Sequence, residues 1–413
     1  MDVTKTSAVF AVVAGLGASA AAEAADLPVA PEPVNYVRVC NAYGDAFYYI
    51  PGTDTCLSIY GRVRIEYRGF NYDRGFRMAT GAAAHARDFD TSQFRARGYL
   101  YTDSRTGTEF GLLRTYTEIY VTDDSPGGSV LTLEHGFVQF GGLTAGRGQS
   151  FYDFANYPTY ASIFTPQLSD QKTNFGAYTF AFGNGLSSTV SLESSDTRRS
   201  SIAGYGPDYG GTKYPDLVAN MRVDQGWGSA QLMGALHQVW PGYNALGATP
   251  DGTLGFAVGA GVQINAPFGR NTVFNLTGTY AQGATQYASN DTTGYYVPST
   301  GAVVSTFDAT YDPATGELEN AVTWSVSGGF ITDITPEFQF ALQAGYSSIE
   351  DQLNSDYGFS NIDVQGNLTW APPSMPGFYL GLGLEYRNVD PDAPGAESGD
   401  AYVGYFRAQR QFN

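Results

Sequence analysis

Apolar and polar residues alternate with a period of two along most of the chain beyond residue 57. In the segment FRAQRQF near the C-terminus, Phe406 and Ala408 share one face, whereas Arg407 and Gln409 share the other. This period is typical of a β-strand whose two faces meet different surroundings. The apolar face of a soluble sheet packs into a core, but in a membrane barrel it contacts lipid and the polar face lines a lumen.

Aromatic residues stand at the ends of the apolar faces, most clearly near the C-terminus. In FYLGLGLEY, Phe378 and Tyr386 bracket three leucines on one face. A strand from Phe378 to Tyr386 would cover roughly 19 Å along a membrane normal, at ~3.3 Å per residue and a tilt near 45°. That length approaches the ~25 Å apolar band between the aromatic girdles of outer-membrane barrels. The pattern therefore favours a membrane barrel over a soluble sandwich.

Sixteen alternating segments follow one another, joined by connections that alternate between short and long. They are expected at 57–67, 89–103, 108–121, 131–142, 143–154, 172–183, 186–196, 217–225, 228–240, 252–266, 272–285, 319–333, 336–350, 358–371, 376–390 and 398–412. Short turns are expected at sites such as 104–107, and long loops at 68–88, 155–171, 197–216 and 286–318. Because a sheet in lipid must close to satisfy its backbone, residues 57–413 are predicted to form a 16-stranded antiparallel transmembrane β-barrel.

Composition supports this fold class and argues against others. Charged residues make up 15% of the chain, compared with ~25% in soluble domains. Beyond the first 25 residues no apolar run reaches the 18 residues of a transmembrane helix. The net charge of -18 makes nucleic acid a poor partner. No P-loop or dinucleotide fingerprint occurs, and no cofactor is expected.

The N-terminus has the pattern of a secretory signal peptide. Lys5 precedes an apolar stretch over 8–18, and Ala22-Glu23-Ala24 forms a small-x-small cleavage site. We predict a signal peptide over residues 1–24, with a short buried helix as the alternative. Its removal takes away Lys5, Asp2 and Glu23, which leaves 21 basic and 38 acidic residues and a net charge of -17.

Residues 25–56 are predicted to form an N-terminal extension that is first proline-rich and then aromatic. Cys40 and Cys56 are the two cysteines of the chain, and an even count in an exported protein favours a disulfide. Closing this loop would add roughly 3 kcal/mol in the chain-entropy model. Two free thiols are the alternative, and a zinc site would need further ligands at metal spacing.

Three stretches resemble the porins of alphaproteobacteria: VNYVRVCNAYGDAFYYIPGTDTCLSIYGRVRIEY (34–67), TEFGLLRTYTEIY (108–120) and FGGLTAGRGQSFYDFANY (140–157). The AADLPV start of the mature chain and its end close to Arg-x-Phe are also similar to that family. The resemblance implies a 16-stranded outer-membrane barrel, usually trimeric, whose third loop folds inward and which passes small hydrophilic solutes passively. It also implies contact with outer-membrane lipid and lipopolysaccharide, and a barrel-assembly machinery that reads Phe412. Asn413 departs from the pattern, since such chains usually end on the aromatic residue.

Arginines cluster early in the barrel on faces opposite to apolar ones. Guanidinium stays charged even among like charges, which suits a positive wall of a pore. The residues predicted to form this wall in the lumen are Arg62, Arg64, Arg95, Arg97 and Arg147.

By the same resemblance, Asp153 and Asp170 beside the third loop are assigned to the acidic side of the constriction. Opposed charges across a narrow passage would create a transverse field that orients dipolar solutes. The alternative for any single arginine is a pair with a nearby Asp or Glu that holds the loop.

These observations predict passive diffusion of small hydrophilic solutes and ions through the barrel. A solute-selective channel of the same fold, for a sugar or an anion, is the first alternative. A barrel enzyme such as a lipase is the second, although His85, His135 and His237 lie far apart and no nucleophile motif accompanies them. A secreted soluble β-protein or adhesin is the third.

Overall fold

The structure is a computed structural model of the chain, and it describes residues 38–78, 89–154, 157–206, 208–244, 249–290, 293–297, 302–353 and 357–412. The predicted signal peptide, residues 25–37 of the predicted extension, His85 and Asn413 lie outside the described residues.

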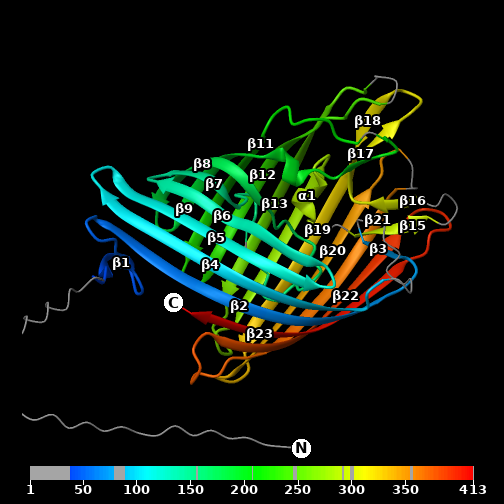
Figure 1. Cartoon of the computed structure of the whole chain (residues 1–413). Helices are drawn as coiled ribbons and strands as arrows, with labels where there is room; N and C mark the ends of the chain where they lie inside the picture. Colours follow the sequence, from blue (N-terminus) through cyan, green and yellow to red (C-terminus); the bar gives the residue numbers. More distant parts are fainter. Residues whose placement is uncertain are drawn as a thin grey trace, which may run out of the picture.

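Sixteen antiparallel strands of the described chain form one closed barrel (Figure 1), which confirms the predicted fold class. The first strand pairs with the last, from Gly61 opposite Phe412 to Tyr72 opposite Ala401, and this pairing closes the sheet. The barrel strands are β2 (Thr55–Tyr72), β4 (Ser92–Thr108), β5 (Gly111–Ser125), β6 (Gly128–Phe140), β7 (Leu143–Gln149), β8 (Lys172–Gly183), β9 (Leu186–Glu193), β11 (Asp216–Gln225), β12 (Gly228–Val239), β13 (Thr253–Asn265), β14 (Val273–Gln282), β19 (Val322–Asp333), β20 (Phe338–Glu350), β21 (Phe359–Trp370), β22 (Phe378–Pro391) and β23 (Gly399–Phe412).

The two ends of the barrel differ in the length of their connections. At one end, the turn end, four connections have only two residues, at 109–110, 141–142, 184–185 and 226–227. The other end, the loop end, carries most of the longer connections and their small elements (Figure 1). These are β3 (Phe76–Met78), η2 (Ser195–Arg198), β10 (Ser201–Ala203), α1 (Thr285–Ala288), β15 (Thr293–Val297), β16 (Ala302–Ser305), β17 (Phe307–Asp312) and β18 (Glu317–Asn320).

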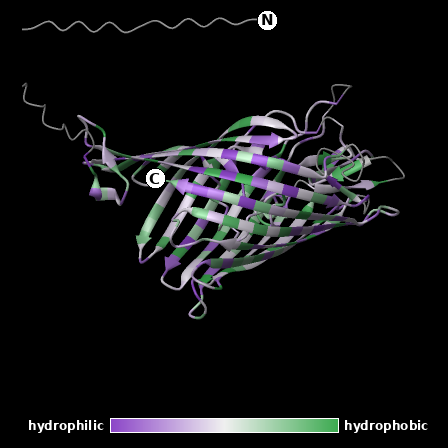
Figure 2. Cartoon of the chain, turned by 60° about the horizontal axis from the view of Figure 1, so that its bottom comes forward, coloured by the Kyte–Doolittle hydropathy of each residue, from purple (hydrophilic) through white to green (hydrophobic). Residues whose placement is uncertain are grey.

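The apolar faces of the strands point outward. Leu384 on β22 is 72% exposed, whereas Gln343 on β20 is completely buried. Figure 2 shows the matching alternation of hydrophobic and hydrophilic positions along the strands. A soluble sandwich would bury the leucine and expose the glutamine, so the predicted orientation is confirmed. Among the described residues, no helix has the length and hydropathy required to cross a membrane.

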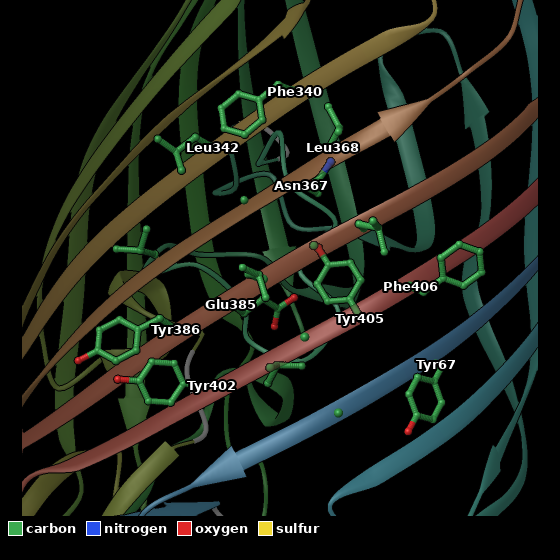
Figure 3. Close-up of a pocket in the computed structure, with 18 residues that line it drawn as sticks. Tyr67, Phe340, Leu342, Asn367, Leu368, Glu385, Tyr386, Tyr402, Tyr405 and Phe406 are labelled. Atoms are coloured by element: carbon green, nitrogen blue, oxygen red, sulfur yellow. The ribbon is translucent and has the colours of Figure 1, made fainter.

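Glycines leave a depression in the outer face of the barrel, near the pairing of its first and last strands. Gly366, Gly404 and Gly69 stand in one row across β21, β23 and β2, with Leu384 of β22 between the first two. The depression that they leave has a volume of about 950 Å³. Figure 3 shows the side chains around it, which include Phe340, Leu368 and Phe406. Because its lining is mostly apolar and faces outward, this depression belongs to the membrane-facing surface.

Several strand boundaries differ from the predicted ones, and β2 continues to Tyr72, into the loop expected at 68–88. A turn was expected at 104–107, but β4 continues to Thr108 and the turn lies at 109–110. Arg105 continues the inner face of β4 beyond Asp103. Its guanidinium and that of Arg114 both donate hydrogen bonds to Asp103, the latter at 2.9 Å. The predicted strand 143–154 ends earlier, at Gln149, and its last residues join the following long connection.

Cys40 and Cys56 form a disulfide with a Cα–Cα distance of 6.0 Å, which confirms the prediction. Cys56 already lies in β2, so the barrel begins slightly before the expected boundary at residue 57. The bond ties η1 (Asn41–Tyr43) and β1 (Tyr48–Tyr49) to the turn end. Phe47 packs against both cysteines, and the Arg105 guanidinium lies 4.8 Å from the centre of its ring.

Candidate functional site

The long connection between β7 and β8, residues 150–171, is anchored to the polar face of β22. The backbone amides of Ser162, Ile163 and Phe164 all donate to the Glu385 carboxylate, the last at 3.0 Å. Glu385 is only 2% exposed. Hydrogen bonds to a charged acceptor are stronger than those between neutral groups, so this carboxylate is a firm anchor.

The same segment is also anchored on β21. The Tyr160 amide donates to Asn367 at 3.0 Å, and the Gln167 amide donates to Asp363 at 3.0 Å. Gln365 donates to the carbonyl of Phe164 at 2.7 Å. All three strand residues lie on the polar face of β21, so the segment covers the faces of two adjacent strands.

The beginning of the segment contacts the polar faces of strands far from β21 and β22. Asn220 of β11 donates to the carbonyl of Phe151 at 2.6 Å, and Gln231 of β12 donates to the carbonyl of Tyr152 at 3.1 Å. Tyr152 also packs against Met233, Ala257 and Tyr287 in a buried apolar cluster. The segment therefore bridges two separate parts of the barrel.

Part of the inner, polar face of β2, β4, β5 and β6 stays accessible to water, and we call the inner face of these four strands the open wall. The side chain of Arg114 on β5 is 26% exposed and that of His135 on β6 is 22% exposed. On the covered strands, by contrast, Gln365 is 1% exposed. Any solute inside the barrel would therefore contact the open wall.

Strand register brings four of the five predicted arginines together on the open wall. Arg64 of β2 stands opposite Arg97 of β4, and the neighbouring rows pair Arg62 with Tyr99 and Glu66 with Arg95. Arg95 binds Asp124 of β5 through two bonds of 2.6 and 2.7 Å. The Arg97 guanidinium donates to the Thr122 hydroxyl at 2.6 Å.

Glu66 is shared among three guanidinium groups. Arg68 donates to it at 2.5 Å, Arg407 donates to its other oxygen at 2.5 Å, and Arg64 lies 4.0 Å away. Sequence reasoning assigned no role to Arg68, although its even spacing from Arg64 and Glu66 places all three on one face. Arg68 and Arg407 join the four predicted arginines, so six guanidinium groups and two carboxylates gather here. They are Arg62, Arg64, Arg68, Arg95, Arg97, Arg407, Glu66 and Asp124.

Arg147 lies elsewhere, and its predicted place in the lumen is wrong. On β7 it shares a face with Leu143, which is exposed on the outside of the barrel. Its register partners are Gly136 and Asn174, and its guanidinium donates to the carbonyl of Leu133 at 2.8 Å. The period of two from Leu143 would have placed Arg147 on the outer face.

Asp153 forms a salt bridge with an arginine that the sequence analysis did not identify. Arg198 of η2 donates to it at 3.0 Å, and both side chains are buried. Burial alone would lower the pKa of Arg198, but the charge of Asp153 raises it above its ordinary value. Gln149 and Ser169 also donate to Asp153. Asp153 thus joins the two ends of the long connection to η2.

Asp170 is paired with Lys172 at 3.0 Å and accepts further bonds from Gln149 and Tyr157. Burial would raise the pKa of Asp170, yet the Lys172 charge and these hydrogen bonds hold it below its usual value. The contacts of Asp153 and Asp170 are therefore of the kind expected when carboxylates hold the loop in place.

A closed barrel with an apolar exterior and an arginine-rich, water-accessible inner wall defines a β-barrel protein of the outer-membrane type. Residues 26–407 match the family described as the Porin subfamily, and the chain belongs to that family. Its place is the bacterial outer membrane.

Curated relatives are similar to large parts of the chain. Porin Omp2b of Brucella suis is 33% identical over 307 residues, which are 64% of this chain and 81% of the relative. Porin Omp2b of Brucella canis is 34% identical over 233 residues, 52% of this chain. That match covers 61% of the Brucella canis protein, less than two thirds of its length.

Solved structures share the fold at low sequence identity. The outer membrane channel DcaP of Acinetobacter baumannii is 16% identical with a TM-score of 0.67, over 88% of this chain and 99% of that one. The anion-selective porin from Comamonas acidovorans is 13% identical with a TM-score of 0.50, over 87% and 100% of the two chains. These likenesses support the barrel architecture.

Proposed function

We propose that the chain forms a water-filled channel for passive diffusion of small hydrophilic solutes and ions across the outer membrane. The observation that carries this proposal is the open wall, a half-buried polar surface of β2, β4, β5 and β6 inside a barrel whose exterior is apolar. Residues 150–171, anchored to Glu385 and Asp363, narrow the passage from the opposite side.

The anion-preferring channel of the same fold is the second candidate, and one observation favours it. The arginine cluster at the open wall, which includes Arg407 of the adjacent β23, contains six guanidinium groups but only two carboxylates. The acidic side of the proposed constriction, Asp153 and Asp170, is engaged by Arg198 and Lys172. We therefore propose that these two carboxylates act as braces of the loop and that the field in the passage is dominated by the arginines.

We propose a channel and not an enzyme. The imidazole of His135 bonds to Glu118 at 2.8 Å, and that of His237 bonds to Asp216 at 2.9 Å and Tyr209 at 3.3 Å. Neither imidazole bonds to a serine hydroxyl among the described contacts, as a Ser-His-Asp arrangement would require.

We further propose a homotrimer surrounded by outer-membrane lipid and lipopolysaccharide. The trimer rests on the family, and one solved structure with the same fold, OmpT of Vibrio cholerae, is described in a trimer form. Phe412 lies exposed at the end of β23, beside Gly61 of β2, where the barrel-assembly machinery would read it.

Planar-bilayer recording of the purified protein tests the proposed function. We expect stepwise single-channel currents that rise in proportion to salt concentration, because passive diffusion has no saturable step. Tight block by one neutral sugar would favour a sugar-selective channel instead. A folded protein that produces no steps would refute the channel.

The double variant Arg62→Gln/Arg64→Gln is expected to move the reversal potential toward the cation side under a salt gradient. Both guanidinium groups lie on the open wall, so their loss removes positive potential from the permeation path. Arg114→Gln is the comparison on the same wall, and it should shift the reversal potential less because this guanidinium is already paired with Asp103 at 2.9 Å. An unchanged reversal potential in the double variant would place these arginines away from the path.

A further inference from the structure

We propose that Arg62, Arg64 and Arg97 form a binding site for oxyanions, that is, for carboxylates and phosphates, and that Tyr99 is the residue that positions it. This proposal rests on the proposed function, because solutes reach the site through the passage. It goes further in claiming a saturable site of defined chemistry in place of a general preference for negative charge.

The ring of Tyr99 is the common contact of the three guanidinium groups. The guanidinium carbon of Arg62 lies 3.8 Å from the ring centre, that of Arg64 5.5 Å, and that of Arg97 5.8 Å. Arg97 also donates to the Tyr99 hydroxyl at 3.2 Å. Such cation–π contacts attract each cation to the ring, so Tyr99 gathers three like charges that would otherwise repel one another.

These three guanidinium groups differ from their neighbours in making no hydrogen bond to a carboxylate among the described residues, and the contact of Arg64 with Glu66 is a long one of 4.0 Å. Arg68 and Arg407 bind Glu66, and Arg95 binds Asp124. The hydrogen-bond acceptors of Arg97 are the neutral hydroxyls of Thr122 and Tyr99. The cluster therefore keeps positive charge that its own carboxylates do not neutralise.

Two buried donors of the site have no acceptor within the described chain. The Nε atoms of Arg62 and Arg64 are buried and make no hydrogen bond there. Glu66, the nearest carboxylate to Arg64, is 4.0 Å away, beyond hydrogen-bond distance. A buried donor without a partner is costly, so an incoming acceptor would relieve that cost.

The geometry of guanidinium favours oxyanions over chloride. Its planar fork of N–H donors matches two oxygen atoms of a carboxylate or phosphate, whereas chloride accepts as a single point. Glu134, another carboxylate on this side, lies 3.5 Å from the Tyr120 hydroxyl and is paired with Lys172 at 3.5 Å. The carboxylates that could compete for the site are thus already engaged.

The test compares Tyr99→Leu with Tyr99→Phe in planar bilayers filled with potassium chloride. In the wild type, added inorganic phosphate should reduce the chloride current along a saturable curve. Tyr99→Phe keeps the aromatic face and should stay within about twofold of wild-type affinity, whereas Tyr99→Leu should weaken it roughly tenfold. A merely structural role of Tyr99 would not predict rescue by phenylalanine.

Equilibrium binding separates failure of this site from failure of the channel. Titration calorimetry with phosphate on detergent-folded protein should give saturable binding that Arg62→Gln abolishes and Arg114→Gln preserves. Acetate as a second titrant shows whether carboxylates share the site. Saturable binding without channel activity would refute the proposed function and leave the site standing. Channel activity without saturable phosphate binding, or a folded Tyr99→Leu variant with wild-type affinity, would overturn the site.

Discussion

Replacing Glu385 by alanine is expected to raise the single-channel conductance. The change removes the acceptor of three backbone amides, those of Ser162, Ile163 and Phe164, and each unsatisfied buried donor costs about 1–3 kcal/mol. Residues 150–171 should then detach from β22, so the passage beside the open wall widens. Single-channel recording in planar bilayers measures the step size, and heat-modifiable gel mobility verifies that the barrel is folded.

Two further variants sharpen this experiment. Glu385→Gln keeps one carbonyl oxygen as an acceptor and should give an intermediate conductance. Glu319→Ala removes an exposed carboxylate from β18, away from the anchored segment, and should leave the step size unchanged. If a folded Glu385→Ala variant conducts like the wild type, then this segment does not limit the passage.

The alternation of side chains was sufficient to predict the barrel, because a strand between lipid and water must change polarity at every residue. Leu384 and Gln343 lie on the faces that their positions in the pattern require. Polar composition misled at 104–107, where Ser, Arg, Thr and Gly suggest a turn but Arg105 continues the inner face of β4. The strand ends depend on pairing with neighbours, which local composition does not encode.

The candidate site was predicted only in part, because its contacts depend on register between distant segments. The alternation of side chains along two strands was enough to place four arginines together correctly, namely Arg62, Arg64, Arg95 and Arg97. The bond between Arg407 and Glu66, however, joins positions 341 residues apart and exists only because the barrel closes.

The partners of the long connection were equally hidden in the sequence. Arg198 and Glu385 anchor it from η2 and β22, and no local pattern relates either residue to Asp153 or Ser162. A signal for Glu385 did exist, since a carboxylate between Leu384 and Tyr386 faces the interior and must find donors there. Residues whose partners come from tertiary structure can therefore be suspected from burial, but their partners cannot be named.

The orientation of the strands predicts a large difference in folding stability between two variants that each introduce an arginine. Leu384→Arg places a charge on the outer face near the middle of β22, and it should destabilise the folded barrel in lipid by about 2–4 kcal/mol. His135→Arg is the matched control on the open wall, where water and Glu118 stabilise the cation, and its stability should stay near that of the wild type. The measurement is the folded fraction against urea in phospholipid vesicles, followed by heat-modifiable gel mobility. The reverse order, with Leu384→Arg tolerated and His135→Arg unfolded, would mean that the apolar faces point inward, and the channel would then have no aqueous wall.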